Sequence, residues 1–199
     1  MGKFESKKVA DQQSTQREIG LFFRDMVFVL SAVVLFMLLV LRGVVVDGDS
    51  MKDTLVDGDY LLLLSSTFYH NPEQGDIFVA SKEDFAGGEP IIKRVIATEG
   101  QTVDIDFVRG VVIVDGVELD EPYTRTVTVG SNGVQFPFVV EEGCLFVLGD
   151  NRAVSKDSRF SDIGLIDCRQ VLGKAVFLIF PGTEQGNVPA DFSRIGAIS

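Results

Sequence analysis

The feature that most constrains this chain is a long apolar run near its amino terminus. Met26–Leu41 contains sixteen residues without a charge, and Ser31 is its only polar side chain. As an α-helix the run is about 24 Å long, at about 1.5 Å per residue, whereas the hydrocarbon core of a bilayer is about 30 Å thick. Apolar flanks, with Arg24 and Arg42 reaching toward the two interfaces, make up the difference. We expect a transmembrane signal-anchor helix over residues 21–42.

This run is either an anchor that stays in the protein or a secretory signal that is cleaved. Leu41-Arg42-Gly43 follows the run, and a cleaved signal would end in a small-x-small pattern, so we expect an uncleaved anchor. Five Lys/Arg precede the run and few follow it soon after. This imbalance favours a single-pass protein of the cytoplasmic membrane, with its amino terminus inside and its body outside. Residues 1–20 are expected to be a flexible cytoplasmic tail.

The charge balance argues against a nucleic-acid partner. The formal net charge is −11; residues 1–42 carry six Lys/Arg against four Asp/Glu, a net charge of +2, which leaves −13 for the rest. Binding to phosphates needs clustered Lys and Arg, and the acidic body has no such cluster.

The two cysteines, Cys144 and Cys168, have neither the spacing of a metal site nor the density of a disulfide scaffold. One interpretation is that both are small buried apolar side chains. The other is a disulfide, which an external compartment allows and which would close a loop of about 25 residues. We expect no metal and no cofactor.

Short apolar runs bounded by Gly, Asp, Asn or Pro predict β-strands after residue 43. These runs are Tyr60–Leu64, Asp76–Ala80, Pro90–Ala97, Gln101–Ile105, Cys144–Leu148 and Gln170–Phe180. Two hairpins are predicted, at Asp115-Gly116 between Val108–Val114 and Val117–Leu119, and at residues 130–133 between Thr124–Val129 and Gln135–Val140. The body is therefore expected to be mainly β. Residues 182–199, rich in Gly and polar side chains, are expected to be a loose C-terminal tail.

The segment Gly48–Leu55 carries the first candidate for catalysis. Ser50 stands two residues after Gly48, as on a turn that lets the backbone approach a substrate. The alternative is a solvated turn serine, which is the commoner kind. A serine nucleophile needs a base within hydrogen-bond reach. The single histidine, His70, lies in a polar turn and is expected to be a solvated loop residue.

Lys93 is the better candidate for the base. In a strand with period two it shares a face with Ile91 and Val95, so its amine would enter an apolar environment. Burial lowers the pKa of a lysine, and the neutral amine can then act as a general base. The alternative is a lysine on an edge strand that extends to water. Arg94, on the opposite face, is interpreted as structural.

The segment Gly149–Arg159 is dense in charge and follows an apolar strand. It is either a solvated loop with local ion pairs or a hydrogen-bonded scaffold for a catalytic site. As a scaffold, Asp157 would pair with Arg159, and Ser155 would orient the amine of Lys93, as a third group orients the base in other nucleophile sites.

These residues together resemble the bacterial type I signal peptidases, membrane-anchored Ser/Lys endopeptidases that remove signal peptides from exported proteins. The resemblance covers the anchor, Ser50-Met51 with Thr54-Leu55, Gly58-Asp59, Gly75-Asp76-Ile77, Lys93–Ile96, Val111–Glu121, and Gly149–Arg152 with Ser155, Asp157, Ser158, Arg159 and Gly164. It implies that Ser50 is the nucleophile and Lys93 the general base. It also implies that Ser155 orients the lysine and that Asp157 and Arg159 hold the site together.

The resemblance implies a fold and a set of partners. The expected fold is an antiparallel β body with a small inserted β lobe: an extracytoplasmic catalytic domain over residues 43–181, with the lobe at about residues 98–147. The implied partners are secreted preproteins and membrane lipid.

Two positions depart from the family's pattern. Asp53 stands where the family usually has proline, and we expect its side chain to accept a hydrogen bond from the turn that proline would stiffen. Gly48 stands where some members have a serine that helps to stabilise the oxyanion. The backbone N–H of Ser50 is therefore expected to be the main donor to the oxyanion.

Two other functions remain open. A self-cleaving Ser/Lys repressor would need a helix-turn-helix DNA-binding domain, and this chain has an anchor instead. A catalytically idle relative that serves as an assembly factor for surface proteins would have lost the serine or the lysine, and both are present. The sequence therefore favours a signal peptidase acting at the outer face of the cytoplasmic membrane.

Overall fold

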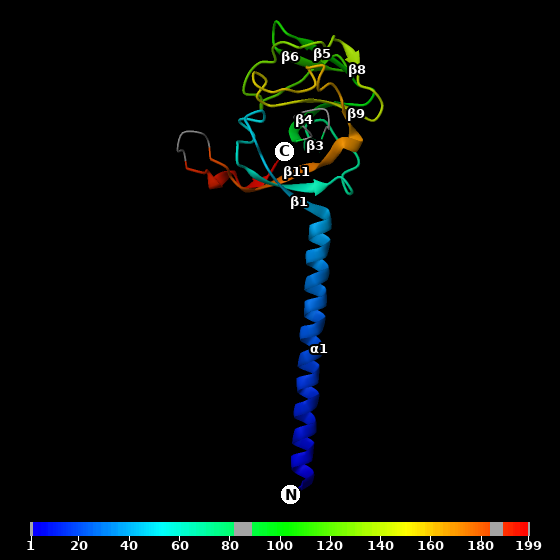
Figure 1. The fold of residues 1–199 in the computed structure, drawn as a ribbon, viewed down its shortest axis with the longest axis vertical. Helices are drawn as coiled ribbons and strands as arrows, with labels where there is room; N and C mark the ends of the chain where they lie inside the picture. The colour runs from blue at the N-terminus through cyan, green and yellow to red at the C-terminus, as the bar shows by residue number, and fades with distance from the viewer. Residues whose placement is uncertain (1, 82–88, 184–188, 199) are drawn as a thin grey trace. The chain divides into compact units, whose positions relative to one another are not determined.

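The computed structural model describes residues 2–81, 89–183 and 189–198. The chain divides into two units after Val40: an amino-terminal helix and a β body that begins at Leu41. In Figure 1 the helix is the blue element α1, and within the body β5, β6 and β8 lie at one end while β1 and β11 lie at the other.

Helix α1 runs from Gly2 to Val40, so the flexible tail predicted for residues 1–20 is helical from residue 2 on. Lys, Glu, Gln, Arg and Ala, which favour helices, are common in this segment, and it contains no proline. Helix also propagates readily from a stable stretch such as the adjoining apolar run. Its Gln16–Val40 portion is long and apolar enough to cross a membrane, with a length of about 38 Å at about 1.5 Å per residue.

The helix ends two residues before the predicted boundary at residue 42. Leu41–Val45 form strand β1 instead, which pairs antiparallel with β2 (Tyr60–Ser65). Glycine and β-branched valines lower the helix propensity of this segment, so strand pairing prevails. The ring of Tyr60 packs over Gly43, and a Cβ there would lie 2.2 Å from the Tyr60 hydroxyl oxygen, so this side chain would have to move.

The described part of the body contains two antiparallel sheets. The larger has the order β1-β2-β11-β3-β4-β9-β10, with β12 beside β11, and the smaller has the order β7-β6-β5-β8. The remaining strands of the larger sheet are β3 (Ile77–Ser81), β4 (Pro90–Thr98), β9 (Cys144–Leu148), β10 (Ile166–Asp167), β11 (Val171–Phe180) and β12 (Gly196–Ala197). Those of the smaller sheet are β5 (Thr102–Asp106), β6 (Val111–Val114), β7 (Val117–Glu118) and β8 (Phe138–Val139). The described residues of the body also form two short 3₁₀ helices, η2 (Cys168–Gln170) and η3 (Phe192–Arg194). The predicted fold class, a mainly antiparallel β body behind an apolar helix, is confirmed.

The smaller sheet shares a hydrophobic core with the larger one. Val103 of β5 and Val112 of β6 pack in one cluster with Ile96 of β4 and Phe146 of β9. Because β9 belongs to the larger sheet, the inserted lobe ends before the predicted residue 147.

One of the two predicted hairpins is confirmed. Strands β6 and β7 pair around Asp115 and Gly116, which have φ of 51° and 80°, as the tight two-residue hairpin turn requires. The second prediction is wrong, because residues 124–129 form no strand and β8 pairs with β5. Side chains distant in sequence bind this backbone instead; for example, the guanidinium of Arg159 donates to the carbonyl oxygen of Val129.

The predicted C-terminal tail, residues 182–199, lies partly outside the described residues. The described part is not loose: β12 pairs with β11, and Ile198 packs against the core. Arg194 also forms an ion pair with the buried carboxylate of Asp59. This contact joins residues 135 apart in the chain, which is why composition alone did not predict it.

The two cysteines are thiols that pack against different hydrophobic clusters, although both line one cavity. Cys144 packs in the cluster that contains Phe146, whereas Cys168 packs in the cluster that contains Leu145. Successive side chains of a strand point to opposite faces, so the structure favours two small apolar side chains over a disulfide.

Candidate active site

Ser50 lies in the loop that joins β1 to β2. A backbone hydrogen bond of 2.8 Å from Val46 N to the carbonyl oxygen of Asp59 closes the base of this loop. Met51 and Leu55 are both buried in the core and anchor its middle. The loop therefore presents Ser50 from a fixed framework rather than from a mobile surface turn.

Gly48 adopts a backbone conformation that favours glycine, with φ of +89°. Its N–H donates to the carboxylate of Asp57 at 2.9 Å. A Cβ at this position would meet no atom within 4 Å, so the backbone conformation, and not a lack of space, accounts for the glycine. A role of Gly48 near an oxyanion stays a prediction.

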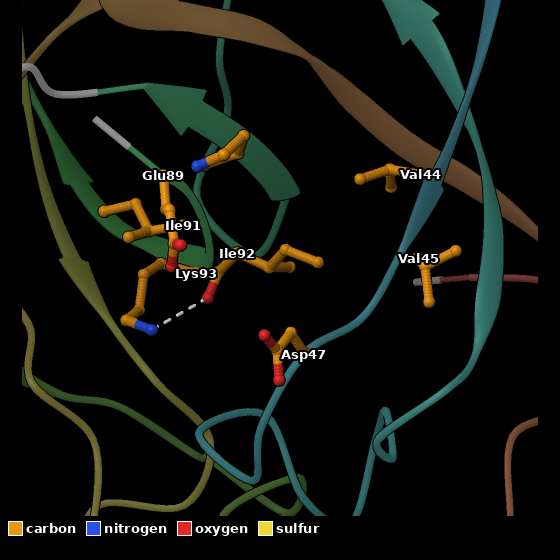
Figure 2. A pocket seen from close by; sticks show the side chains of 8 residues that line it. Val44, Val45, Asp47, Glu89, Ile91, Ile92 and Lys93 are labelled. Carbon is orange, nitrogen blue, oxygen red and sulfur yellow. Dashed lines mark hydrogen bonds between the residues drawn. The ribbon is translucent and has the colours of Figure 1, made fainter. Parts of the chain in front are cut away.

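Lys93 on β4 reaches the serine directly. Its Nζ lies 2.8 Å from Ser50 Oγ and 3.0 Å from the carbonyl oxygen of Ile92, the second contact being drawn in Figure 2. The side chain is only 4% exposed, so the alternative of a lysine that extends to water is wrong. Burial lowers the pKa of Lys93 to about 8, although the nearby carboxylates of Asp157 and Asp150 act in the opposite direction.

One buried carboxylate links the strand that carries Lys93 to the loop that carries Ser50. Asp150 accepts hydrogen bonds from Arg94 Nε at 3.0 Å, from Arg94 Nη2 at 2.9 Å and from Thr54 Oγ1 at 2.5 Å. Arg94 follows Lys93 in the chain, and Thr54 lies four residues after Ser50. Sequence reasoning gave Asp150 no role, although its place in Gly149-Asp150-Asn151-Arg152 was a usable signal.

The turn that follows β9 packs against the serine loop. Asn151 donates its backbone N–H to the carbonyl oxygen of Ser50 at 3.0 Å, and its Nδ2 to the carbonyl oxygen of Asp49 at 3.1 Å. Gly149 lies between Ser50 and Ser155: a Cβ there would be 2.5 Å from Ser50 O and 2.3 Å from Ser155 Oγ. Only glycine allows the two segments to approach this closely.

Asp157 and Arg159 form a buried ion pair, with Nε 2.8 Å from Oδ1 and Nη2 2.9 Å from Oδ2. Asp157 also accepts from the N–H of Gly149 at 3.2 Å, and Arg159 donates to the carbonyl oxygens of Arg152 and Ser155. Such charge-assisted bonds stiffen a turn and satisfy the two buried charges. The pair therefore braces the turn that packs on Ser50.

Ser155 is buried, but its hydroxyl makes no hydrogen bond to any residue that the structure describes. The predicted contact with Lys93 Nζ is therefore not present in this structure. Buried hydroxyls usually have a partner, and an unpaired one costs stability. The role of Ser155 in orienting the lysine stays a prediction.

Asp53, at the position where proline was expected, forms an ion pair with Arg125. The expectation that its side chain would accept a hydrogen bond from the backbone of the turn is wrong. The two side chains are 65% and 46% exposed, so their pair contributes at most about 1 kcal/mol to stability.

A pocket of about 380 Å³ opens beside Lys93. Figure 2 shows its two sides: Val44, Val45 and Asp47 come from the segment that leads to Ser50, and Glu89, Ile91, Ile92 and Lys93 come from the start of β4. Pairing of β4 with β9 begins only at Arg94. The backbone of residues 90–93 therefore has no strand partner on the β9 side among the described residues, and an extended peptide can pair there.

His70 lies away from this pocket. It lines a second cavity of about 340 Å³ together with Thr98, Cys144 and Cys168, and neither Ser50 nor Lys93 lines that cavity. Within the described ranges, no group of three or more His, Cys, Asp or Glu residues is arranged to hold a metal ion.

The sequence matches a known protein family and several of its members. Residues 19–180 match the family model described as signal peptidase, peptidase S26. The chain is 34% identical over 151 residues to the probable signal peptidase I-1 of Synechocystis sp., covering 72% of this chain and 73% of that protein. It is 32% identical over 187 residues to signal peptidase I of Bacillus licheniformis, covering 88% and 97%. A crystal structure of a signal peptidase I from Enterococcus faecalis is 31% identical, with a TM-score of 0.41, and covers 52% of this chain and 96% of that one.

Proposed function

The chain belongs to the signal peptidase family, peptidase S26, and we propose that Ser50 and Lys93 are the Ser/Lys dyad with which it cleaves. It is a serine endopeptidase that removes signal peptides from preproteins. The observation that supports the dyad most strongly is the 2.8 Å contact between Lys93 Nζ and Ser50 Oγ. A nucleophile within hydrogen-bond reach of a base is the arrangement that covalent catalysis requires.

In the first half of the reaction, the neutral amine of Lys93 takes the proton of the Ser50 hydroxyl as Oγ attacks the scissile carbonyl carbon. The C–N bond of the resulting tetrahedral intermediate then breaks. The ammonium of Lys93 returns the proton to the departing nitrogen, which becomes the new amino terminus of the mature protein. The signal peptide remains as an ester on Ser50.

In the second half, water replaces the departed amine. Lys93 takes a proton from the water as the water oxygen attacks the ester carbon. Lys93 then gives that proton to Ser50 Oγ as the ester bond breaks. The signal peptide leaves as a carboxylic acid, and the dyad regains its starting state. Lys93 is thus base and acid in turn, which a group with a pKa near the working pH can do.

The backbone N–H of Ser50 is the proposed donor to the oxyanion. This N–H donates to no acceptor within the described ranges of the chain, so it is available to an oxygen that develops negative charge. Donors of this kind act most strongly where water is excluded. Gly48 contributes the conformation of the turn and has no hydroxyl to offer.

We propose that the preprotein binds in extended form along residues 90–93 of β4. Its backbone would pair with the strand edge there, and its small side chains would enter the pocket that Val44, Val45, Ile91 and Ile92 line. This mode of strand addition provides affinity through backbone hydrogen bonds and selectivity through alternate side chains.

The apolar helix and the family make this a membrane-anchored enzyme. We propose that the body lies at the outer face of the cytoplasmic membrane, because five Lys and Arg precede the apolar run whereas only Arg42 and Lys52 follow it closely. The anchor would keep the dyad close to the lipid surface from which preproteins emerge.

The function is tested by incubating the purified full-length protein with a preprotein and sequencing the new amino terminus. Cleavage at a single bond after the signal peptide, abolished by Ser50→Ala, is the expected result. An assembly factor without catalytic activity would leave the preprotein intact, and a self-cleaving protein would cut only itself.

A further inference from the structure

We infer that Arg194, close to the end of the chain, is a positioning residue for Ser50. Its guanidinium holds the serine loop at two points, the carboxylate of Asp59 and the carbonyl oxygen of Thr54, and so keeps the hydroxyl within reach of Lys93. This inference rests on the proposed roles of Ser50 and Lys93.

The first point of attachment is the end of the serine loop. Arg194 Nη2 lies 2.6 Å from Asp59 Oδ2, and Nη1 lies 3.0 Å from Oδ1. Asp59 is fully buried and also accepts from the N–H groups of Val56 at 2.8 Å and Gly182 at 2.7 Å. Arg194 thus supplies the positive charge for a carboxylate that fixes the backbone where the loop closes.

The second point of attachment is in the middle of the same loop. Arg194 Nη2 donates to the carbonyl oxygen of Thr54 at 3.2 Å, while the hydroxyl of Thr54 donates to Asp150 at 2.5 Å. Thr54 is therefore held from two directions, by the turn after β9 and by the C-terminal segment. A planar guanidinium with five N–H donors can bridge two acceptors in this way, whereas a lysine ammonium is a compact point charge.

The C-terminal segment also meets the serine loop through apolar contacts, since Ile198 packs against the cluster that contains Met51 and Leu55. A cavity of about 270 Å³ separates it in part from the body, with Thr54, Leu55 and Leu178 on one side and Arg194, Ala197 and Ile198 also lining it. Strand β12 contributes a two-residue pairing with β11. Within the described residues 189–198, Arg194 provides the side-chain hydrogen bonds to the loop, and its guanidinium can be altered without removing the segment.

A loosened loop would change the environment of Lys93 as well as the position of Ser50. Water entering between the loop and β4 would reduce the desolvation that lowers the pKa of the amine. The carboxylates of Asp157 and Asp150 favour the ammonium form, and those of Asp47 and Glu89 line the adjoining pocket. The fall of activity on the acid side of the pH profile, its acid limb, would then move to higher pH. A residue that only supports the fold would lower the amount of active enzyme and leave this limb in place.

The test compares Arg194→Lys and Arg194→Gln with the parent protein, using preprotein cleavage across pH and thermal unfolding by circular dichroism. Arg194→Lys keeps the charge beside Asp59 and loses the bridge to Thr54, so it separates positioning from folding. Arg169→Gln is the matched control, because Arg169 has an 89% exposed side chain and pairs with Asp167 at the surface.

Arg194→Lys should unfold near the parental temperature, with KM within about twofold of the parent and kcat reduced roughly tenfold, because small misplacements of reacting groups are costly. The acid limb of its pH profile should lie at higher pH than that of the parent. Arg194→Gln should show larger changes in the same direction. Arg169→Gln should match the parent.

Parental kcat and an unmoved limb in Arg194→Lys would overturn the inference, as would a loss of activity that merely follows the loss of folded protein. A parent protein that does not cleave, or a Ser50→Ala variant that does, would refute the dyad itself and the positioning role with it.

Discussion

Lys93 Nζ and Ser50 Oγ lie 2.8 Å apart although 43 residues separate them in the chain. Neither residue sets this distance alone. Asp150 binds Arg94, the neighbour of the lysine, and Thr54, in the loop of the serine, with a single carboxylate. The turn after β9 thus connects the segments that carry the two groups of the proposed dyad.

Cleavage should fall on the acid side with an apparent pKa of about 8. Burial lowers the pKa of Lys93 to about this value, so below it the amine already carries the proton that it must accept from Ser50, and above it the amine is neutral. The profile of kcat/KM from about pH 6 to about pH 10 reports this group in the free enzyme. A limb at about 6.5, the ordinary pKa of histidine, would instead implicate His70.

Ser155→Ala should lower kcat by roughly tenfold or less while leaving stability unchanged or slightly higher, because the variant removes a buried hydroxyl that has no partner. Ser158→Ala is the matched control, since the Ser158 hydroxyl is also buried but accepts from the N–H of Val147 at 3.1 Å. The control should lose stability. Parental kcat in Ser155→Ala would rule out a role of this residue in orienting the lysine.

Asp53→Pro should fold and cleave within about threefold of the parent, because the exposed ion pair with Arg125 contributes at most about 1 kcal/mol. Proline removes no hydrogen bond here, since the N–H of Asp53 donates to no residue in the described part of the chain. Arg125→Ala removes the same ion pair from its other side and should behave alike. A folded but inactive Asp53→Pro would mean that the turn around Ser50 differs from that of the family.

Protease added to intact spheroplasts should digest the body, because the distribution of Lys and Arg around the apolar run favours an outside location. The measurement is the size of the protein fragment that survives digestion. Spheroplasts opened before digestion serve as the control. Protection of the body, with digestion only before Arg24, would reverse the orientation.

Much of the fold could be predicted from local patterns. The period of two in Pro90–Ala97 placed Lys93 on an apolar face, and Asp115-Gly116 identified a hairpin. Strand β1 could not be distinguished from the helix before it, because Leu41–Val45 continues the apolar run and forms a strand only by pairing with β2.

The parts that sequence reasoning missed depend on contacts between distant residues. Residues 124–129 look like a strand, but Arg159 and other polar groups bind their backbone. Asp150 and Arg194 act on the serine loop through hydrogen bonds that span 96 and 140 residues of the chain. No local period marks such contacts. By contrast, Ser50 and Lys93 could be proposed early, because a turn serine and a lysine on an apolar strand each have a recognisable setting.

The most direct test of the dyad is preprotein cleavage by Ser50→Ala, Lys93→Met, Lys93→Arg and the double variant Ser50→Ala/Lys93→Met, with folding checked by circular dichroism. Each single variant should lose at least about a thousandfold in kcat, and the double variant should be little worse, because the two groups act as a unit. Lys93→Arg should be as inactive as Lys93→Met, since a guanidinium stays protonated and cannot serve as a base. Substantial turnover by folded Lys93→Met would contradict the account and return His70 to consideration as the base.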